Sequence, residues 1–239
     1  MKTDVSLIIP TYNERENIRQ CLDGLVKAFS GGKAAYELII VDDNSTDGTY
    51  ETVKNYSGRN KRIKAFLRTG EKGIGSAIFF GMKKSSGTYL IPFMADLSDD
   101  PEDALRLYNK IKEGYDVVFT NRFKGKNRAY GYPHPKYYFN RLYNLMIATL
   151  FNLKYTDTSN AFKAVRKDIV DRLDIKCKGF EFTTELALKS YFRGKRFSEI
   201  PVTWNNREKG KQKSSLLKIG RGYLRVLLLL LNEKRKNKG

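Results

Sequence analysis

Cysteine and histidine are nearly absent from this sequence, whose 239 residues include two cysteines and one histidine. Cys21 and Cys177 have no spacing typical of a metal site or a disulfide framework, which favours two reduced thiols in a cytosolic protein. His134 lies in the stretch YPHP, outside every motif described below, and we expect it at the surface or at an interface. The sequence therefore predicts a site that works without histidine.

Long apolar runs are also missing. The longest, VLLLLL at 226–231, has about a third of the ~20 residues that a membrane-spanning helix needs. The first residues of the chain turn charged after five apolar residues, which is not the pattern of a signal peptide. We therefore expect neither a spanning helix nor a signal peptide in this sequence.

Positive charge, in contrast, is abundant. Lysine and arginine number 45 against 26 acidic residues, which gives a formal net charge of +19. Seven bases and no acid lie between Asp116 and Asp157, and eleven bases with two acids lie between Asn206 and Gly239. This excess predicts an anionic partner, which could be a nucleic acid, a membrane surface or a phosphorylated small molecule.

Apolar runs and amphipathic stretches alternate through the first half of the chain. Runs rich in Val, Ile and Leu predict buried strands, and each is followed by a stretch with helical periodicity. Such alternation with short connections predicts an α/β fold built on a parallel sheet. The expected strands lie at 5–10, 36–41, 63–67, 88–93 and 115–120.

The second half of the chain has a different pattern. We expect an aromatic-rich helix at 134–153, a short strand at 162–167, a helix at 181–194 and a strand at 197–204. The chain ends with apolar residues interleaved with bases, which predicts an amphipathic basic helix and tail at 216–239. The simplest organisation is one compact domain over 1–215 with this extension after it.

Acidic side chains gather where the expected strands end. The stretch FMADLSDDPED at 93–103 has five acids in eleven positions. Ligands of an open parallel sheet bind at the carboxyl ends of its strands, and two carboxylates with a phosphorylated ligand are a usual setting for Mg²⁺ or Mn²⁺. The alternative is that these acids are turn formers and helix caps. The acids concerned are Asp42, Asp43, Asp96, Asp99 and Asp100.

The sequence shows a family resemblance in four stretches: VSLIIPTYNERENI, YELIIVDDNSTDGT, GEKGIGSAIFFGMKKSSGTYLIPFMADLSDDPED and VVFTNRF. Together they resemble the family 2 glycosyltransferases of GT-A fold, and within them the dolichyl- and polyprenyl-phosphate mannosyltransferases and glucosyltransferases. The resemblance covers residues 1–215 and is most specific over the first 122. It implies a GT-A, Rossmann-like, mostly parallel sheet flanked by helices, with the catalytic domain at 1–215 and amphipathic basic helices at the C-terminus.

The resemblance implies a nucleotide-sugar site at the first strand ends. The family has a loop that surrounds the nucleotide, an acid that accepts a hydrogen bond from the base, and a closing segment that matches GEKGIGSA. The matching substrate-binding residues are Pro10, Tyr12, Glu14, Asp43 and Lys72. Asp42 lies beside Asp43, and it either belongs to the same site or caps the turn.

The stretch MAD at 94–96 occupies the position of the family's D-x-D metal motif. Asp96 matches the second acid, which implies a catalytic role and a place in the metal site. Met94 stands where the first acid is usual, and a thioether is a poor ligand for Mg²⁺ or Mn²⁺. Ser98 lies at the next position that the family can use for the metal. Asp99 and Asp100 are close enough in sequence to compensate for the missing acid.

Later motifs imply a site for phosphates. The stretch TNRF places Arg122 among the catalytic residues, and Arg141 in the aromatic helix resembles a second phosphate-binding arginine. Asp157 in DTSNAFKAVRK is a candidate catalytic acid that orients the sugar or the acceptor. Substrate-binding residues are also implied at Glu185 in FEFTTEL and, where Gln212 replaces the usual serine of the family, at Arg207 and Lys213.

These residues imply metal-dependent, inverting transfer of a hexose, with mannose favoured, from GDP-mannose or UDP-glucose to dolichyl or polyprenyl phosphate. A hydroxyl acceptor needs a general base, whereas a lipid phosphate is already an anion and needs cations beside it. The acid-free basic stretch at 122–154 and the lack of a motif histidine favour the phosphate. The expected location is peripheral, on the cytoplasmic face of a membrane, with or without a separate membrane subunit.

Other functions stay open at this point. A family 2 enzyme acting on a sugar hydroxyl would need Asp157 or Glu185 as its base. A non-catalytic scaffold would fit the broken metal motif at Met94. A nucleic-acid-binding protein fits the charge, but no such motif is present and the acidic edge would repel phosphates without a metal, so we expect no nucleic acid partner. A dinucleotide-dependent oxidoreductase is disfavoured, because GIGSA lacks the full glycine pattern and does not follow the first strand.

Overall fold

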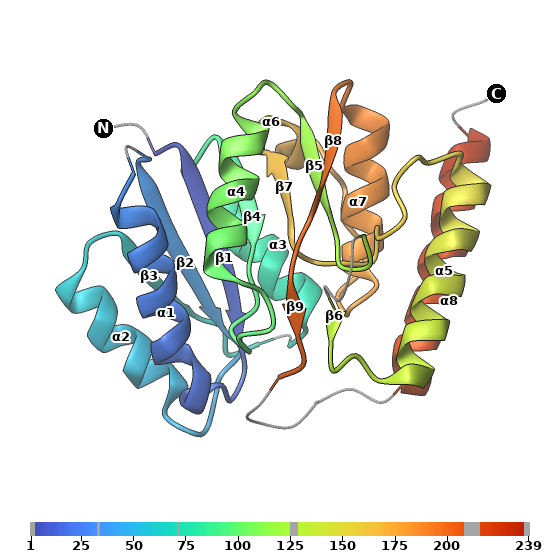
Figure 1. The fold of residues 1–239 in the computed structure, drawn as a ribbon. Coiled ribbons are helices and arrows are strands. Elements are labelled where there is room, and N and C mark those ends of the chain that lie inside the picture. Colours follow the sequence, from blue (N-terminus) through green and yellow to red (C-terminus); the bar gives the residue numbers. More distant parts are fainter. Residues whose placement is uncertain (1–2, 33, 71, 125–128, 208–215, 237–239) are drawn as a thin grey trace.

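The computed structural model describes residues 3–32, 34–70, 72–124, 129–207 and 216–236. The predicted α/β architecture is confirmed (Figure 1). In chain order the elements are β1 (Val5–Thr11), α1 (Arg15–Ser30), β2 (Tyr36–Asp42), α2 (Thr49–Arg59), β3 (Ile63–Leu67), α3 (Ile74–Lys84), β4 (Tyr89–Pro92), α4 (Pro101–Ile111), β5 (Val117–Asn121), β6 (Ala129–Tyr130), α5 (His134–Phe151), β7 (Lys163–Arg166), α6 (Lys167–Asp171), α7 (Phe182–Arg193), β8 (Phe197–Pro201), β9 (Trp204–Asn205) and α8 (Leu216–Lys236).

The central sheet has the strand order β3-β2-β1-β4-β7-β5-β8. Neighbouring strands are parallel except at β7, which runs antiparallel to both β4 and β5. β1 and β2 are buried along their whole length, which explains their continuous apolar sequences. In the sheet, β2 lies on one side of β1 and β4 lies on the other side, so the connections leave β1 in opposite directions. The carboxyl end of β1 is therefore a topological switch point, where open sheets bind ligands.

Helices cover both faces of the sheet (Figure 1). On one face, Leu22 of α1 and Leu107 of α4 share a buried cluster with Leu7 of β1. On the other face, Met82 of α3 and Leu186 of α7 belong to a second buried cluster. This second cluster extends to the margin of the molecule, where α5 and α8 lie side by side.

The C-terminal helix α8 is part of this second core. Tyr143 of α5 stacks on Tyr223 of α8, with 4.3 Å between the ring centroids. Val226 and Leu230 of α8 are fully buried in the second cluster. The apolar run at 226–231 thus packs in part against the domain, and the predicted boundary after residue 215 stays a prediction.

The stretch 197–204, predicted as one strand, is divided in the structure. β8 ends at Pro201, and β9 pairs with β6 in a separate two-stranded sheet. The backbone N–H of Thr203 donates to Asp103 Oδ2 of α4 at 2.8 Å, which draws the chain away from the sheet. As a result Trp204 forms an isolated antiparallel bridge with Asp99 in the acidic loop after β4.

Candidate active site

The two acids at the end of β2 have different surroundings. Asp42 is fully buried and accepts hydrogen bonds from Thr11 Oγ1, from the backbone N–H of Ser45 and from Ser45 Oγ, at 2.8, 2.8 and 2.7 Å. A carboxylate with this set of local donors fixes the turn after the strand. Asp42 therefore caps the turn, and its assignment as a substrate-binding residue stays a prediction.

Asp43 connects the end of β2 to the start of α3. Its Oδ2 accepts a hydrogen bond from the backbone N–H of Gly73 at 2.8 Å. Its Oδ1 lies 2.9 Å from Arg68 Nε, although this ion pair lacks the alignment of a hydrogen bond. Burial raises the pKa of Asp43 in spite of both partners. The Asp43 side chain is thus held at the switch point, and its Oδ1 accepts no hydrogen bond from the residues that the structure describes.

The loop after β1 and the loop before α3 meet beside Asp43. Lys72 Nζ lies 4.7 Å from the ring centroid of Tyr12, and both side chains are exposed. Pro10 is buried in β1, opposite Val41 of β2. The structure thus brings Pro10, Tyr12, Asp43 and Lys72 together, as the resemblance implied for a nucleotide site.

Glu14 lies between β1 and α1, and its carboxylate contacts Arg207 and Asn17. Nη2 of Arg207 lies 3.1 and 3.0 Å from the two carboxylate oxygens of Glu14, and Asn17 Nδ2 donates to Glu14 Oε2 at 2.9 Å. Arg207 is therefore brought to the β1 end of the site by a residue near the start of the chain. Lys213 lies outside the described residues.

The acids after β4 have fewer partners than those after β2. Asp96 is half-buried, and its Oδ1 accepts one hydrogen bond, from the backbone N–H of Ser98 at 3.2 Å. Asp99 is 4% exposed, and its Oδ1 has no hydrogen-bond partner among the described residues. Burial, followed by the charge of Asp96, raises the pKa of Asp99 to about 8. Asp100 is exposed and caps α4 by accepting from the N–H of Glu102 at 2.9 Å.

The turn between Asp96 and Ser98 contains a strained residue. Leu97 has a φ of 62°, a left-handed conformation that costs a leucine roughly 1–2 kcal/mol. The loops after β1 and β2 use Asn13 and Asn44 for the same conformation, which asparagine tolerates. A hydrogen bond from the N–H of Asn205 to the carbonyl of Ser98, at 2.9 Å, holds the strained turn in place. Strain of this kind is typical of functional loops.

The donors after β4 fit a hard divalent cation that a phosphate completes. No group of three or more His, Cys, Asp or Glu side chains within the described part of the chain is arranged to hold a metal alone. Mg²⁺ is usually bound by one or two carboxylates together with substrate phosphates and water. Asp96, Ser98 and the Asp99 oxygen that has no partner within the described ranges match such an incomplete set, whereas Met94 offers only a thioether.

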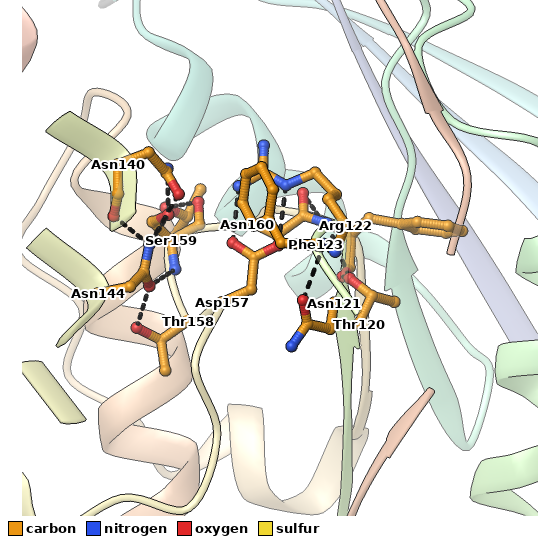
Figure 2. A network of polar contacts seen from close by, with 12 residues as sticks. Thr120, Asn121, Arg122, Phe123, Asn140, Asn144, Asp157, Thr158, Ser159 and Asn160 are labelled. Carbon is orange, nitrogen blue, oxygen red and sulfur yellow. Dashed lines mark hydrogen bonds and ion pairs between the residues drawn. The ribbon is translucent and has the colours of Figure 1, made fainter. Parts of the chain in front are cut away.

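Arg122 and Asp157 form a buried bidentate ion pair (Figure 2). Arg122 Nε and Nη2 donate to the two Asp157 oxygens at 2.9 and 2.7 Å, and the N–H of Arg122 donates to Oδ2 at 3.0 Å. Asp157 is 1% and Arg122 8% exposed. Burial by itself would lower the pKa of Arg122, but the Asp157 carboxylate outweighs it and raises that pKa. The structure thus pairs two residues that the sequence had predicted as separate parts of the site.

The loop that contains Asp157 is fixed by a polar network that the sequence did not predict (Figure 2). Asn144 of α5 accepts hydrogen bonds from Thr158 Oγ1 and the N–H of Ser159, and donates to Ser159 Oγ. Lys163, fully buried in β7, donates to three backbone carbonyl oxygens of this loop and of α7. Burial lowers the pKa of Lys163 to about 7. The feature of the sequence that could have indicated this network is Lys163, a lysine within a predicted strand.

Two more cations lie near Arg122. The guanidinium of Arg141 lies 5.2 Å from the Phe123 ring and donates to the carbonyl of Thr156 at 3.2 Å. Lys136, which the sequence analysis did not single out, lies 5.4 Å from the Tyr132 ring. Burial and then the charge of Arg122 lower the pKa of Lys136. The acid-free stretch 122–154 was the signal that these bases gather at one site.

Glu185 has its partners elsewhere. It is fully buried and accepts hydrogen bonds from the backbone N–H groups of Lys176 and Cys177, at 3.0 and 2.7 Å. Its Oε1 also lies 2.8 Å from Lys189 Nζ. These contacts fix the loop before α7, and its assignment as a substrate-binding residue stays a prediction.

Comparison with known proteins identifies the family. A model of glycosyl transferase family 2 matches residues 6–174. The chain belongs to this family. Among curated relatives of this family 2 chain, a dolichol-phosphate mannosyltransferase from Pyrococcus furiosus is 31% identical over 215 residues, which cover 87% of the chain and 58% of that protein. An undecaprenyl-phosphate 4-deoxy-4-formamido-L-arabinose transferase from Proteus mirabilis is 31% identical over 216 residues, which cover 90% of the chain and 64% of that protein.

The family 2 chain spans 58 to 64% of the length of these relatives. Among solved structures, glucosyl-3-phosphoglycerate synthase from Mycobacterium tuberculosis, in complex with Mn²⁺, UDP and phosphoglyceric acid, aligns with a TM-score of 0.70 and 18% identity, covering 96% of this chain and 78% of that one. The same enzyme in complex with Mg²⁺ and UDP aligns with a TM-score of 0.67 and 17% identity. This alignment covers 96% of this chain and 79% of that one. This likeness shows the fold and confirms the predicted GT-A class.

Proposed function

We propose that this family 2 chain is a metal-dependent, inverting glycosyltransferase that moves a hexose, with mannose favoured, from a nucleotide sugar to dolichyl or polyprenyl phosphate. The buried Arg122–Asp157 pair supports this choice of acceptor. A hydroxyl acceptor needs a carboxylate that is free to take its proton. Both candidates, Asp157 and Glu185, are instead held in ion pairs with bases and in hydrogen bonds with backbone N–H groups. A phosphate acceptor needs no such base.

The donor occupies the carboxyl ends of β1, β2 and β4 in this proposal. Asp43 accepts a hydrogen bond from the base, with Pro10, Tyr12, Glu14 and Lys72 around the nucleotide. Asp42 holds the turn beneath it. Asp96 and Ser98 hold Mg²⁺ or Mn²⁺, which when bound neutralises charge developing on the leaving diphosphate. Arg207 lies by the phosphates, and the matching role of Lys213, which lies outside the described residues, rests on the family resemblance alone. GDP-mannose and UDP-glucose are the candidate donors.

The acceptor phosphate lies against the cations on the β5 side. Its oxygen attacks the anomeric carbon from the face opposite the diphosphate, so that one C–O bond forms as the other breaks. Arg122, Lys136 and Arg141 hold this anion beside the charged donor, which lowers the repulsion between them. Asp157 orients the guanidinium of Arg122 through its two hydrogen bonds.

The acceptor is a membrane lipid, so the enzyme must reach a bilayer. Within the described residues, none of the helices has the length and apolar character needed to cross one. Helix α5 exposes Tyr138, Leu142 and Leu145, at 67, 68 and 61%, and the adjacent α8 exposes Leu224 at 59% together with Arg225. Apolar residues with neighbouring bases suit the headgroup region of anionic lipid. We place this surface on the cytoplasmic leaflet, bound directly or through a separate membrane subunit.

The test measures transfer of radiolabelled sugar into the organic phase. The protein is incubated with Mn²⁺, GDP-mannose or UDP-glucose, and a polyprenyl phosphate. We expect label in the lipid fraction, and none when the free polyprenol replaces its phosphate. Equal labelling of the free alcohol would show a hydroxyl acceptor and contradict the proposal, as would the absence of transfer from either donor.

A further inference from the structure

Met94 leaves the metal motif of this chain without its first carboxylate, and Asp99 has a buried carboxylate oxygen without a hydrogen-bond partner in the part of the chain that the structure describes. Building on the proposed function, we propose that Asp99 supplies the missing ligand, so that Asp96 and Asp99 together hold the Mg²⁺ or Mn²⁺ ion. The family motif has its first carboxylate at the position of Met94, two residues before Asp96. In this chain Asp99, three residues after Asp96, takes over that role.

Burial is the first argument. Asp99 is 4% exposed, and a buried carboxylate normally has hydrogen bonds or a cation as its partner. The nearby cation, Arg122, already gives two side-chain hydrogen bonds to Asp157. The strongest charge acting on Asp99 is that of Asp96, which is repulsive. Two carboxylates in this relation are stabilised by a divalent ion between them.

The backbone around Asp99 is already fixed in place. Asp99 forms the antiparallel bridge with Trp204, and the N–H of Asn205 donates to the carbonyl of Ser98 at 2.9 Å. The loop is thus attached to β9 at Ser98 and Asp99, and it does not need to fold around the ion. Positioning of a ligand before binding reduces the entropy that is lost when the metal binds.

Asp100 is the alternative that the structure excludes. Its side chain is exposed and accepts the hydrogen bond from the N–H of Glu102 that begins α4. This contact is the usual N-cap arrangement, and Pro101 at the first helical position accompanies it. Asp100 therefore has a structural role next to Asp99, which makes it a matched control of identical charge.

The experiment uses Mn²⁺ alone as the probe, with no donor or acceptor. Trp204 is the single tryptophan of the chain and lies at the bridge with Asp99, so bound paramagnetic Mn²⁺ should quench its fluorescence. Electron paramagnetic resonance of the free Mn²⁺ gives an independent dissociation constant. We expect Asp99→Asn to weaken Mn²⁺ binding at least about tenfold, and Asp100→Asn to leave it within about twofold, because asparagine also caps helices.

Two further variants separate the possible outcomes. Met94→Asp added to Asp99→Asn should restore binding, since it returns a carboxylate to the usual place. Wild-type affinity in Asp99→Asn, or an equal loss in Asp100→Asn, would overturn the inference. Asp96→Asn tests the proposed function separately: if it keeps full Mn²⁺ affinity, the metal site itself is misplaced. Asp99→Glu covers the case in which Asp99→Asn does not fold, and it should retain measurable binding.

Discussion

The ends of β2 and β4 have the same residue type at the same edge of the sheet, but in different surroundings. After β2, Asp42 accepts three hydrogen bonds and Asp43 has a backbone N–H and an arginine beside it. After β4, Asp96 accepts one long hydrogen bond and Asp99 Oδ1 none among the described residues. The comparison teaches that a carboxylate which accepts hydrogen bonds from its own loop fixes the conformation of that loop. A buried carboxylate oxygen without such donors is available to bind a ligand.

The largest expected effect is on activity at the β4 end. In the proposed mechanism, Asp96→Ala should lower sugar transfer at least about 100-fold, because the metal ion that would stabilise charge on the leaving diphosphate loses a ligand. The folded state should be little affected, since among the described residues the Asp96 side chain accepts one long hydrogen bond, at 3.2 Å. Turnover measured at saturating donor, with far-ultraviolet circular dichroism of the variant, checks this. Unchanged turnover would show that Asp96 has no role in transfer, and would contradict the functional difference between the acids after β2 and those after β4.

The next effect is on stability, at the buried ion pair. Asp157→Ala leaves Arg122 buried and without its carboxylate, which should lower the free energy of unfolding by about 3–5 kcal/mol. Lys124→Ala is the control, because its pair with Glu199 has a 61% exposed lysine and should contribute less than about 1 kcal/mol. Urea unfolding of both variants gives the two values. Equal losses would mean that burial does not strengthen the pair.

The two strand ends should respond to mutation with opposite signs. Asp42→Ala leaves buried donors unsatisfied and should lower the free energy of unfolding by about 1–3 kcal/mol. Asp99→Asn removes a buried charge that Asp96 repels and that no metal ion offsets in the metal-free protein, and should raise it by at least about 1 kcal/mol at pH 9. Denaturation in the presence of a chelator measures both. A change of the same sign in the free energy of unfolding of both variants would contradict this difference between the two strand ends.

A further effect is the pH dependence of stability that a buried base causes. Burial lowers the pKa of Lys163 from 10.5 to about 7, so between these values the folded protein binds fewer protons than the unfolded chain. The stability contribution of Lys163 therefore increases as pH rises from about 7 towards 10.5, and its full penalty applies below pH 7. Lys163→Met should flatten this part of the stability profile. An unchanged slope in urea unfolding across pH 6.5–9.5 would contradict it.

The first half of the fold could be predicted from sequence because its strands are continuous apolar runs joined by amphipathic helices. The position of β7 could not, since FKAVRK is too short to indicate its partner or its direction. The pairing of Arg122 with Asp157 joins residues 35 positions apart, and no local pattern indicates it. Asp100 could have been recognised as the cap of α4, because Pro101 follows it directly.

The contact between Glu14 and Arg207 has a consequence for how the protein is made. It joins residues 193 positions apart, so it forms only when nearly all of the described chain has been synthesised. The parallel strands β1 to β4 can associate much earlier, since their contacts are closer in sequence. A nascent chain on the ribosome therefore assembles most of its sheet before the loop after β1 obtains its final anchor.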